Sequence, residues 1–143
     1  MQRQRGLTLL ELLVVLAIIG FASAGIALSL RDGQQTQLDN EAQRLMAHLE
    51  AARVSSRTSG VTLTWRGTGD GYTILRPGSK PFKTEQWLYP TTVVSASTNP
   101  VVLGPEPIIA PVTLTLSQAG SKPPATQIVR IGTDGLRPFE RLP

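Results

Sequence analysis

The feature that most constrains this chain is an uninterrupted apolar run near its N-terminus. From Leu12 to Leu30 the sequence has 19 residues without a charged side chain. At about 1.5 Å per residue, an α-helix of this length covers roughly 28 Å, close to the hydrocarbon thickness of a bilayer. Arg3 and Arg5 precede the run, and basic residues favour the cytoplasmic side. The run therefore predicts a membrane-spanning helix, with the remainder of the chain exported.

The composition sets limits on the rest of the protein. A chain of 143 residues allows one domain with a modest core beside the anchor. The formal net charge is only +4, and Arg3 and Arg5 account for two of these charges. Such a balance gives little support for nucleic-acid binding. The absence of cysteine excludes a disulfide framework, a thiolate nucleophile and a Cys-type zinc site.

The apolar run has three interpretations. A conventional signal peptide would be cleaved after Ala22-Ser23-Ala24, ahead of Gly25. An uncleaved transmembrane anchor needs no processing site, but it leaves Glu11 as an unexplained charge at the membrane. The third interpretation places a cleavage site ahead of the run, and it depends on a family resemblance.

The segment from Arg5 to Leu13, Arg-Gly-Leu-Thr-Leu-Leu-Glu-Leu-Leu, resembles the class III signal of type IV pilins and type II secretion pseudopilins. The resemblance implies that a prepilin peptidase removes residues 1–6 by cutting between Gly6 and Leu7. The same enzyme then methylates the new N-terminal residue, Leu7, a position where most members of the family have phenylalanine.

Glu11 would then be the fifth residue of the mature chain, as the family requires. A lone charge in hydrocarbon costs about 2.5 to 3.5 kcal/mol on insertion scales, so it persists where a partner neutralises it. The resemblance implies that the partner is the N-terminal amine of a neighbouring subunit, and that the pair docks an incoming subunit in register. The alternative is that the Glu11 side chain only extends to the lipid headgroups.

A second helical pattern follows the predicted membrane helix of residues 7–30. Arg31-Asp32-Gly33 marks the exit from the bilayer, and Gly33 could bend or loosen the helix. Apolar and small residues then recur at alternating steps of four and three, which predicts an amphipathic helix over residues 31–59. The helix is expected to stop near Ser59-Gly60. The residues of this stripe are Leu38, Ala42, Leu45, Leu49, Ala52 and Ser56.

The other face of the amphipathic helix is charged. Glu41 and Arg44 are three residues apart, as are Glu50 and Arg53. Pairs with this spacing each add a few tenths of a kcal/mol to a helix. Both pairs are expected to lie on a solvated face.

Beyond the helix, residues 60–143 predict a β-rich head. Val61 to Trp65 alternates, Gly67 to Gly71 is rich in turn residues, and Tyr72 to Leu75 returns, which indicates a β-hairpin. Prolines favour a loop with short edge strands in the middle of the head; they are Pro100, Pro105, Pro107 and Pro111. Further strands are predicted over residues 85–89, 92–96, 112–116 and 127–131. The expected fold is thus α+β and pilin-like, a long helix packed on an antiparallel sheet.

The sequence offers little material for catalysis or for a metal site. His48 is the sole histidine, and it lies in the amphipathic helix without a second ligand at a suitable spacing. There is no G-x-S-x-G motif, and the aspartates are too scattered for a calcium loop. Gly67, Gly69 and Gly71 lack the lysine of a phosphate loop and indicate a turn. We therefore expect no enzyme, no metal and no cofactor.

Arg130, Arg137 and Arg141 form a mild basic group near the C-terminus, with Phe139 between them. Such a combination could contact DNA. The alternative, which we favour, is a solvated strand face whose charges discourage edge pairing.

Two further segments resemble one subgroup of pilin-like proteins. Ala42 to Arg53 followed by Ser59-Gly60-Val61, and Ile131 to Gly135 followed by Pro138-Phe139, are similar to H-type (GspH-like) minor pseudopilins, which are related to FimT-type minor pilins. The resemblance implies a subunit at or near the tip of a periplasmic pseudopilus that helps export folded proteins. Its location would be the inner membrane, with the N-terminus cytoplasmic and the head periplasmic.

The expected partners follow from the same resemblance. They are the other minor and major pseudopilins, the prepilin peptidase and, in transit, secreted exoproteins. A minor pilin of a type IV pilus, used in adhesion, motility or DNA uptake, shares every N-terminal feature and stays open as an alternative. A conventionally secreted soluble protein is the alternative from another class.

Overall fold

The computed structural model describes residues 9–78, 81–120 and 127–143, without the side chains of residues 26–32. The chain divides into two compact units, Met1–Gln34 and Gln35–Pro143. Helix α1 (Leu9–Ser59) contributes to both units, and all eight strands of the described chain belong to the second. We call the second unit the head.

In the first unit, α1 exposes every described side chain from residue 9 to residue 25. The backbone remains helical through Gly33, where the sequence allowed a bend. Among the described residues, no helix has both the length and the apolar character that a membrane crossing requires. The expected span, residues 7–30, includes residues 7–8 and the side chains of residues 26–30, which lie outside the description.

In the head, the predicted stripe of apolar and small residues is the part of α1 that is buried in the core. All six of its residues, Leu38, Ala42, Leu45, Leu49, Ala52 and Ser56, are buried. The helix ends at Ser59, as expected, and Gly60 follows with a φ of 66°. This left-handed conformation is the one in which glycine commonly ends a helix. The alternating spacing of four and three was therefore a reliable guide to the buried face.

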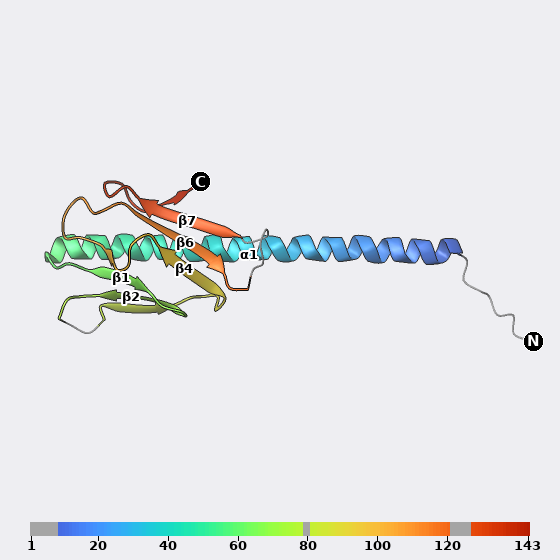
Figure 1. Ribbon diagram of the computed structural model, residues 1–143, viewed down its shortest axis with the longest axis horizontal. Helices are drawn as coiled ribbons and strands as arrows, with labels where there is room; N and C mark the ends of the chain where they lie inside the picture. The colour runs from blue at the N-terminus through green and yellow to red at the C-terminus, as the bar shows by residue number, and fades with distance from the viewer. Residues whose placement is uncertain (1–8, 79–80, 121–126) are drawn as a thin grey trace, which may run out of the picture. The chain divides into compact units, whose positions relative to one another are not determined.

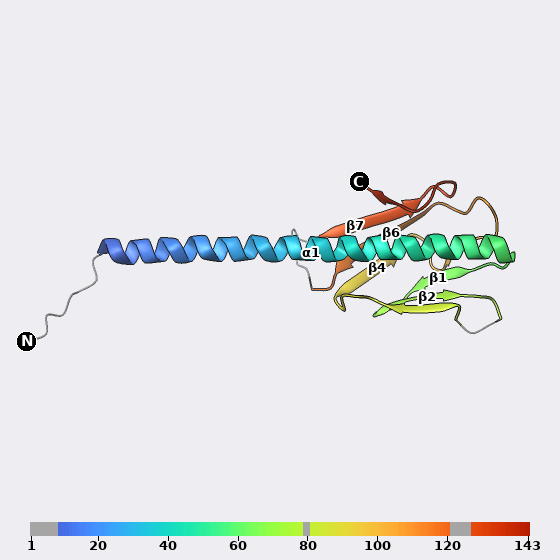
Figure 2. The same cartoon turned by 180° about the vertical axis from the view of Figure 1, so that it is seen from behind.

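Two antiparallel four-stranded sheets cover this stripe (Figure 1). In Figure 1 strands β4 and β6 pass in front of the second half of α1, and in Figure 2 the helix passes in front of them. The first sheet has the order β3 (Lys83–Gln86), β2 (Gly71–Leu75), β1 (Thr64–Gly67), β5 (Val101–Val102). The second has the order β4 (Thr92–Ala96), β6 (Val112–Gln118), β7 (Ile128–Thr133), β8 (Glu140–Leu142).

The predicted hairpin is confirmed as β1 and β2. Their register pairs Thr64 with Leu75 and Gly67 with Tyr72, so β1 begins three residues later than Val61. The glycine that opens β2 is needed for packing, because a Cβ at Gly71 would lie 2.0 Å from the carbonyl oxygen of Glu85. Any side chain there would push β3 away from the sheet.

The other strand predictions differ from the structure mainly at their ends. Residues 92–96 form β4 as predicted, and the strands expected at 112–116 and 127–131 are β6 and β7, each extended by two residues at its C-terminal end. The strand expected at residues 85–89 corresponds to β3, which begins two residues earlier, at Lys83, and ends at Gln86. The closing strand pair implied by the resemblance is β7 with β8.

Candidate functional site

The residues that the sequence singled out for processing and docking lie at the start of the chain. Gly6 and Leu7 fall outside the described residues. Glu11 is exposed in the first turn of α1, where a carboxylate interacts favourably with the positive end of the helix dipole.

Large apolar side chains surround Glu11 along this part of the helix, and all of them are exposed. They are Leu9, Leu10, Leu12, Leu13, Val14, Val15, Leu16, Ile18, Ile19 and Phe21. Full burial of one such side chain contributes about 1.5 to 3 kcal/mol. The segment is therefore a surface suited to burial against lipid or other helices, with a single carboxylate near its start. We call residues 9–21 the apolar segment.

In the head, the Glu41 carboxylate holds the connection between the two sheets. Glu41 is only 1% exposed. Its Oε1 atom accepts hydrogen bonds from the backbone N–H groups of Leu88 and Tyr89, the latter at 3.2 Å. Its Oε2 atom lies 3.8 Å from the Arg44 guanidinium. Because the Glu41 side chain accepts hydrogen bonds from these two amides, the residues after β3 leave the sheet. This explains why no strand forms over residues 87–89.

Arg53, 2% exposed, holds the turn between β7 and β8 in a similar way. Its guanidinium donates to the carbonyl oxygens of Arg137 at 3.0 Å and Gly135 at 3.3 Å. It also pairs with Glu50 at 3.1 Å, and Glu50 accepts from the Phe139 N–H at 2.8 Å. Two buried charges on α1 thus hold two loops. Glu41 holds the connection after β3, and Arg53 holds the turn between β7 and β8.

The prediction of a solvated charged face is therefore wrong for Glu41 and Arg53, although both predicted pairs form. The reason is that their partners are backbone groups far along the chain, and burial of a charge is tolerated when it is hydrogen-bonded. Their positions gave a signal. Glu41 lies three residues after Leu38, and Arg53 lies four after Leu49, so both border the buried stripe.

A third polar cluster, which the sequence did not indicate, joins α1 to β2 and β3. The His48 Nδ1 atom contacts the Tyr72 hydroxyl, and its Nε2 atom lies 3.1 Å from Lys83 Nζ. Lys83 is also 3.2 Å from a carboxylate oxygen of Glu85, and Arg44 binds the other oxygen. The cluster ties an edge strand to the helix.

Burial and the neighbouring Lys83 ammonium lower the pKa of His48 from its ordinary value of 6.5. Burial raises the pKa of the Tyr72 hydroxyl. Desolvation by burial acts to raise the pKa of the Glu85 carboxyl. The hydrogen bond and charge of Lys83 and the charge of Arg44 outweigh this effect, so the pKa of Glu85 is lowered. His48 is thus a neutral hydrogen-bonding residue at neutral pH. Within the described part of the chain, no group of three or more metal-ligating side chains is close enough to hold an ion.

The C-terminal arginines do not combine into one basic surface with Phe139. Phe139 is buried, and Arg137 pairs with Asp134 at 3.0 Å and lies 3.6 Å from Glu140. Arg141 pairs with Asp39 of α1 at 2.7 Å. The hydrogen bonds of Asp134 with the backbone of this turn lower its pKa.

Two family models match the chain. Residues 1–27 match the model described as the prokaryotic N-terminal methylation motif. Residues 41–135, about two thirds of the chain, match the model of the type II transport protein GspH. The chain belongs to the GspH family. The second match covers the C-terminal part of α1 and both sheets up to the β7–β8 turn, which are the elements that Glu41 and Arg53 hold together.

A solved structure has the same fold. The type IV minor pilin FimU of Pseudomonas aeruginosa strain PAO1 is 18% identical, with a TM-score of 0.58. The similarity covers 76% of this chain and 90% of FimU. No curated protein matches the chain. This GspH-family protein is therefore a pilin-like minor pseudopilin or minor pilin, with an N-terminal methylation motif, and the families that it matches consist of structural subunits.

Proposed function

We propose that this GspH-family chain is a minor pseudopilin of a type II secretion system. It assembles at or near the tip of a periplasmic pseudopilus and helps to export folded proteins across the outer membrane. The observation that carries the proposal is the position of the GspH match, which lies on the head at residues 41–135. The N-terminal motif, by contrast, is common to pilin-like proteins in general.

The apolar segment supports a filament role. Its exposed side chains need cover from outside the chain, and lipid before assembly and neighbouring helices after assembly would both provide it. We infer that residues 7–30 anchor the subunit in the inner membrane, with the head in the periplasm. Cleavage then occurs between Gly6 and Leu7, and Leu7 becomes the methylated N-terminus.

Mass spectrometry of the protein purified from its own host tests the processing step. We expect a mature chain that starts at N-methylated Leu7, and Gly6→Val should leave the uncut precursor in the membrane. A mature chain that starts at Gly25 would instead show a conventional signal peptide and a soluble secreted protein. An intact Met1 would show an uncleaved anchor.

Glu11 is the residue we assign to docking with the N-terminal amine of a neighbouring subunit. Glu11→Leu should leave membrane insertion intact but block incorporation into the filament, whereas Glu11→Asp, which keeps the charge, should retain part of it. Crosslinking to other pseudopilins and secretion of an exoprotein are the measurements. Normal secretion with Glu11→Leu would exclude the docking role.

The second candidate is a minor pilin of a type IV pilus, which the fold similarity to the minor pilin FimU favours. Deletion of the gene distinguishes the two systems. Loss of protein secretion with normal pili supports the pseudopilin, and loss of pilus-dependent adhesion, twitching or transformation with normal secretion supports the pilin.

A further inference from the structure

Strand β3 forms one edge of the first sheet, and its backbone is oriented to accept a further strand. The Trp87 N–H donates to the Asp70 carbonyl at 3.0 Å, so these two residues form a hydrogen-bonded pair in the register of β2 and β3. Because hydrogen-bonded and non-hydrogen-bonded pairs alternate, the backbone groups of Thr84 and Gln86 face away from β2. The Gln86 carbonyl agrees with this direction, since it accepts a hydrogen bond from Arg44 of α1 at 2.8 Å.

The free part of this edge is short. Thr84 is exposed, and within the described ranges its outward N–H and C=O groups have no hydrogen-bond partner. Toward the start of β3, the Phe82 N–H points inward and donates to the Ile74 carbonyl at 2.8 Å. An added segment therefore pairs with Thr84 and Gln86 and does not extend past Phe82.

A hollow of about 90 Å³ lies beside this edge. Its volume exceeds the roughly 10 to 15 Å³ that a single water molecule needs. Gly71 lies opposite Gln86 in the register and contributes no side chain, which leaves space between β3 and the turn that joins β1 to β2. The residues that line the hollow are Thr68, Asp70, Gly71, Thr84, Glu85 and Gln86.

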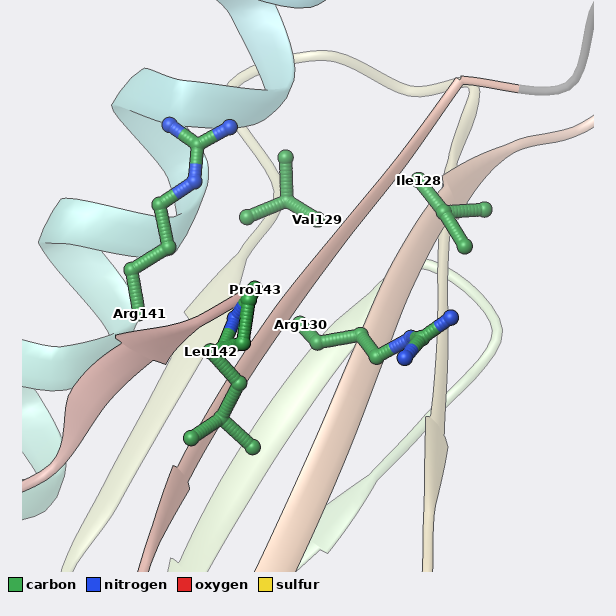
Figure 3. A pocket seen from close by; sticks show the side chains of 6 residues that line it. All are labelled: Ile128, Val129, Arg130, Arg141, Leu142 and Pro143. Atoms are coloured by element: carbon green, nitrogen blue, oxygen red, sulfur yellow. The ribbon is translucent and has the colours of Figure 1, made fainter.

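The available charge in this hollow is negative. Asp70 is exposed, and none of the ion pairs within the described ranges includes it. The Glu85 carboxylate, in contrast, already forms two ion pairs. The groove beside β8 in the second sheet has the opposite charge, because Arg130 and Arg141 line it (Figure 3). A basic side chain therefore complements the hollow beside β3 and not that groove.

The spacing of the strands selects a long side chain. The side chains of β3 alternate between the face that contacts α1 and the opposite face, and those of Thr84 and Gln86 point away from α1. A strand added to this edge would lie about 5 Å beyond β3 and about 10 Å from β2. Its residue opposite Gln86 shares the face of Gln86, next to the hollow. A lysine or arginine there can extend over Gly71 to the Asp70 carboxylate, whereas a short side chain ends above β3.

From this arrangement we propose that the edge of β3 binds an extended segment of another protein chain, and that this segment carries a lysine or an arginine. The segment exchanges backbone hydrogen bonds with Thr84 and Gln86. Its basic side chain occupies the hollow and pairs with Asp70. The contact is small and acts as one specific element of a larger protein interface. It is independent of which filament system contains the subunit.

The test uses the full chain, ¹⁵N-labelled and in detergent micelles, titrated with the acetylated and amidated peptide Thr-Val-Lys-Val-Thr. We expect saturable shifts of the Thr84 and Gln86 amide signals, with a dissociation constant of about 1 mM or lower. The matched peptide Thr-Val-Glu-Val-Thr should bind at least about tenfold more weakly. Absence of shifts at millimolar peptide, or equal binding of both peptides, would overturn the proposal.

Two variants separate the charge from the backbone pairing. Asp70→Lys keeps the backbone carbonyl that Trp87 uses, and it should weaken binding of the lysine peptide by at least about tenfold and permit binding of the glutamate peptide. Thr84→Pro removes an N–H that faces outward, which an edge strand tolerates, and it should weaken binding of the lysine peptide. Glu106→Lys, at an exposed glutamate between β5 and β6, is the matched control and should change neither peptide.

Three outcomes with these variants would contradict the proposal. Equal losses in Asp70→Lys and Glu106→Lys would show a general effect of charge. Unchanged binding by a folded Thr84→Pro variant would show an ion pair without strand addition. Shifts of the Thr84 amide that depend on protein concentration alone would assign the edge to a second copy of this chain instead.

Discussion

Helix α1 carries apolar side chains in two different arrangements. Between residues 9 and 21 they occur on every side of the helix and are exposed, whereas between Leu38 and Ser56 they form one stripe that the two sheets bury. An all-round apolar surface can be covered only by something outside the chain, while a stripe is covered by the chain's own sheets. The difference separates the residues that stabilise the head from those that are available for assembly.

The largest expected effect contrasts two leucines of this helix. Leu45→Ala in the buried stripe should lower the free energy of unfolding of the head by about 2 to 5 kcal/mol, because it leaves a cavity in the core. Leu16→Ala in the apolar segment should leave it unchanged. Denaturant unfolding followed by fluorescence of the buried Trp65 and Trp87 measures both. Equal losses would mean that the apolar segment also stabilises the head.

A smaller effect is expected from the same substitution at two glutamates. Glu41→Leu removes the buried acceptor of two part-buried backbone N–H groups. Each group left unsatisfied costs about 1 to 3 kcal/mol, partly recovered by the apolar side chain. A net loss of about 2 kcal/mol in head stability is therefore expected. Glu11→Leu should not change head stability, and under the proposed docking role it should affect assembly alone. If Glu41→Leu is neutral, the carboxylate does not hold the connection after β3.

The smallest expected effect is a pH dependence of the stability of the head. It is assigned to His48, which lies in the head and is the only histidine of the chain. Its pKa is lowered in the folded chain, so the unfolded chain binds more protons and stability should fall as the pH drops below about 6.5. The slope should stay well below about 1.4 kcal/mol per pH unit, because solvent screens the partly buried ring.

His48→Gln should flatten this slope between about pH 7 and pH 5.5 in the same unfolding assay. Glu85, whose pKa is also lowered, contributes a separate loss nearer its ordinary value of 4.5. An unchanged slope in the variant would place the responsible proton on another group.

The sequence predicted the elements whose information is local. The spacing of Leu38, Leu45 and Leu49 identified the buried face, and the glycine-rich turn before Tyr72 identified the first hairpin. The division into two sheets was not predictable, because it depends on pairings such as Trp65 with Val101 that join distant segments. Short strands such as β5 and β8 likewise form only because a longer neighbour supplies their hydrogen bonds.

The buried charges were missed for a related reason. The pattern of apolar and polar residues along a helix predicts that every glutamate and arginine faces solvent. It gives no information about backbone groups from distant parts of the chain that can hydrogen-bond with these side chains. Gly135 and Arg137, which receive the Arg53 guanidinium, lie 82 and 84 residues away. The processing residues Gly6 and Leu7 stay predictions, since they depend on a motif and lie outside the described structure.

The start of the head at Gln35 has a practical consequence for sample preparation. The core begins at Leu38, and the polar contacts that hold the sheets to the helix begin with Gln37 and Asp39. A fragment that begins at Gln35 would retain this core and lose the exposed apolar segment. Such a truncation is the natural choice for crystallisation and for solution spectroscopy without micelles.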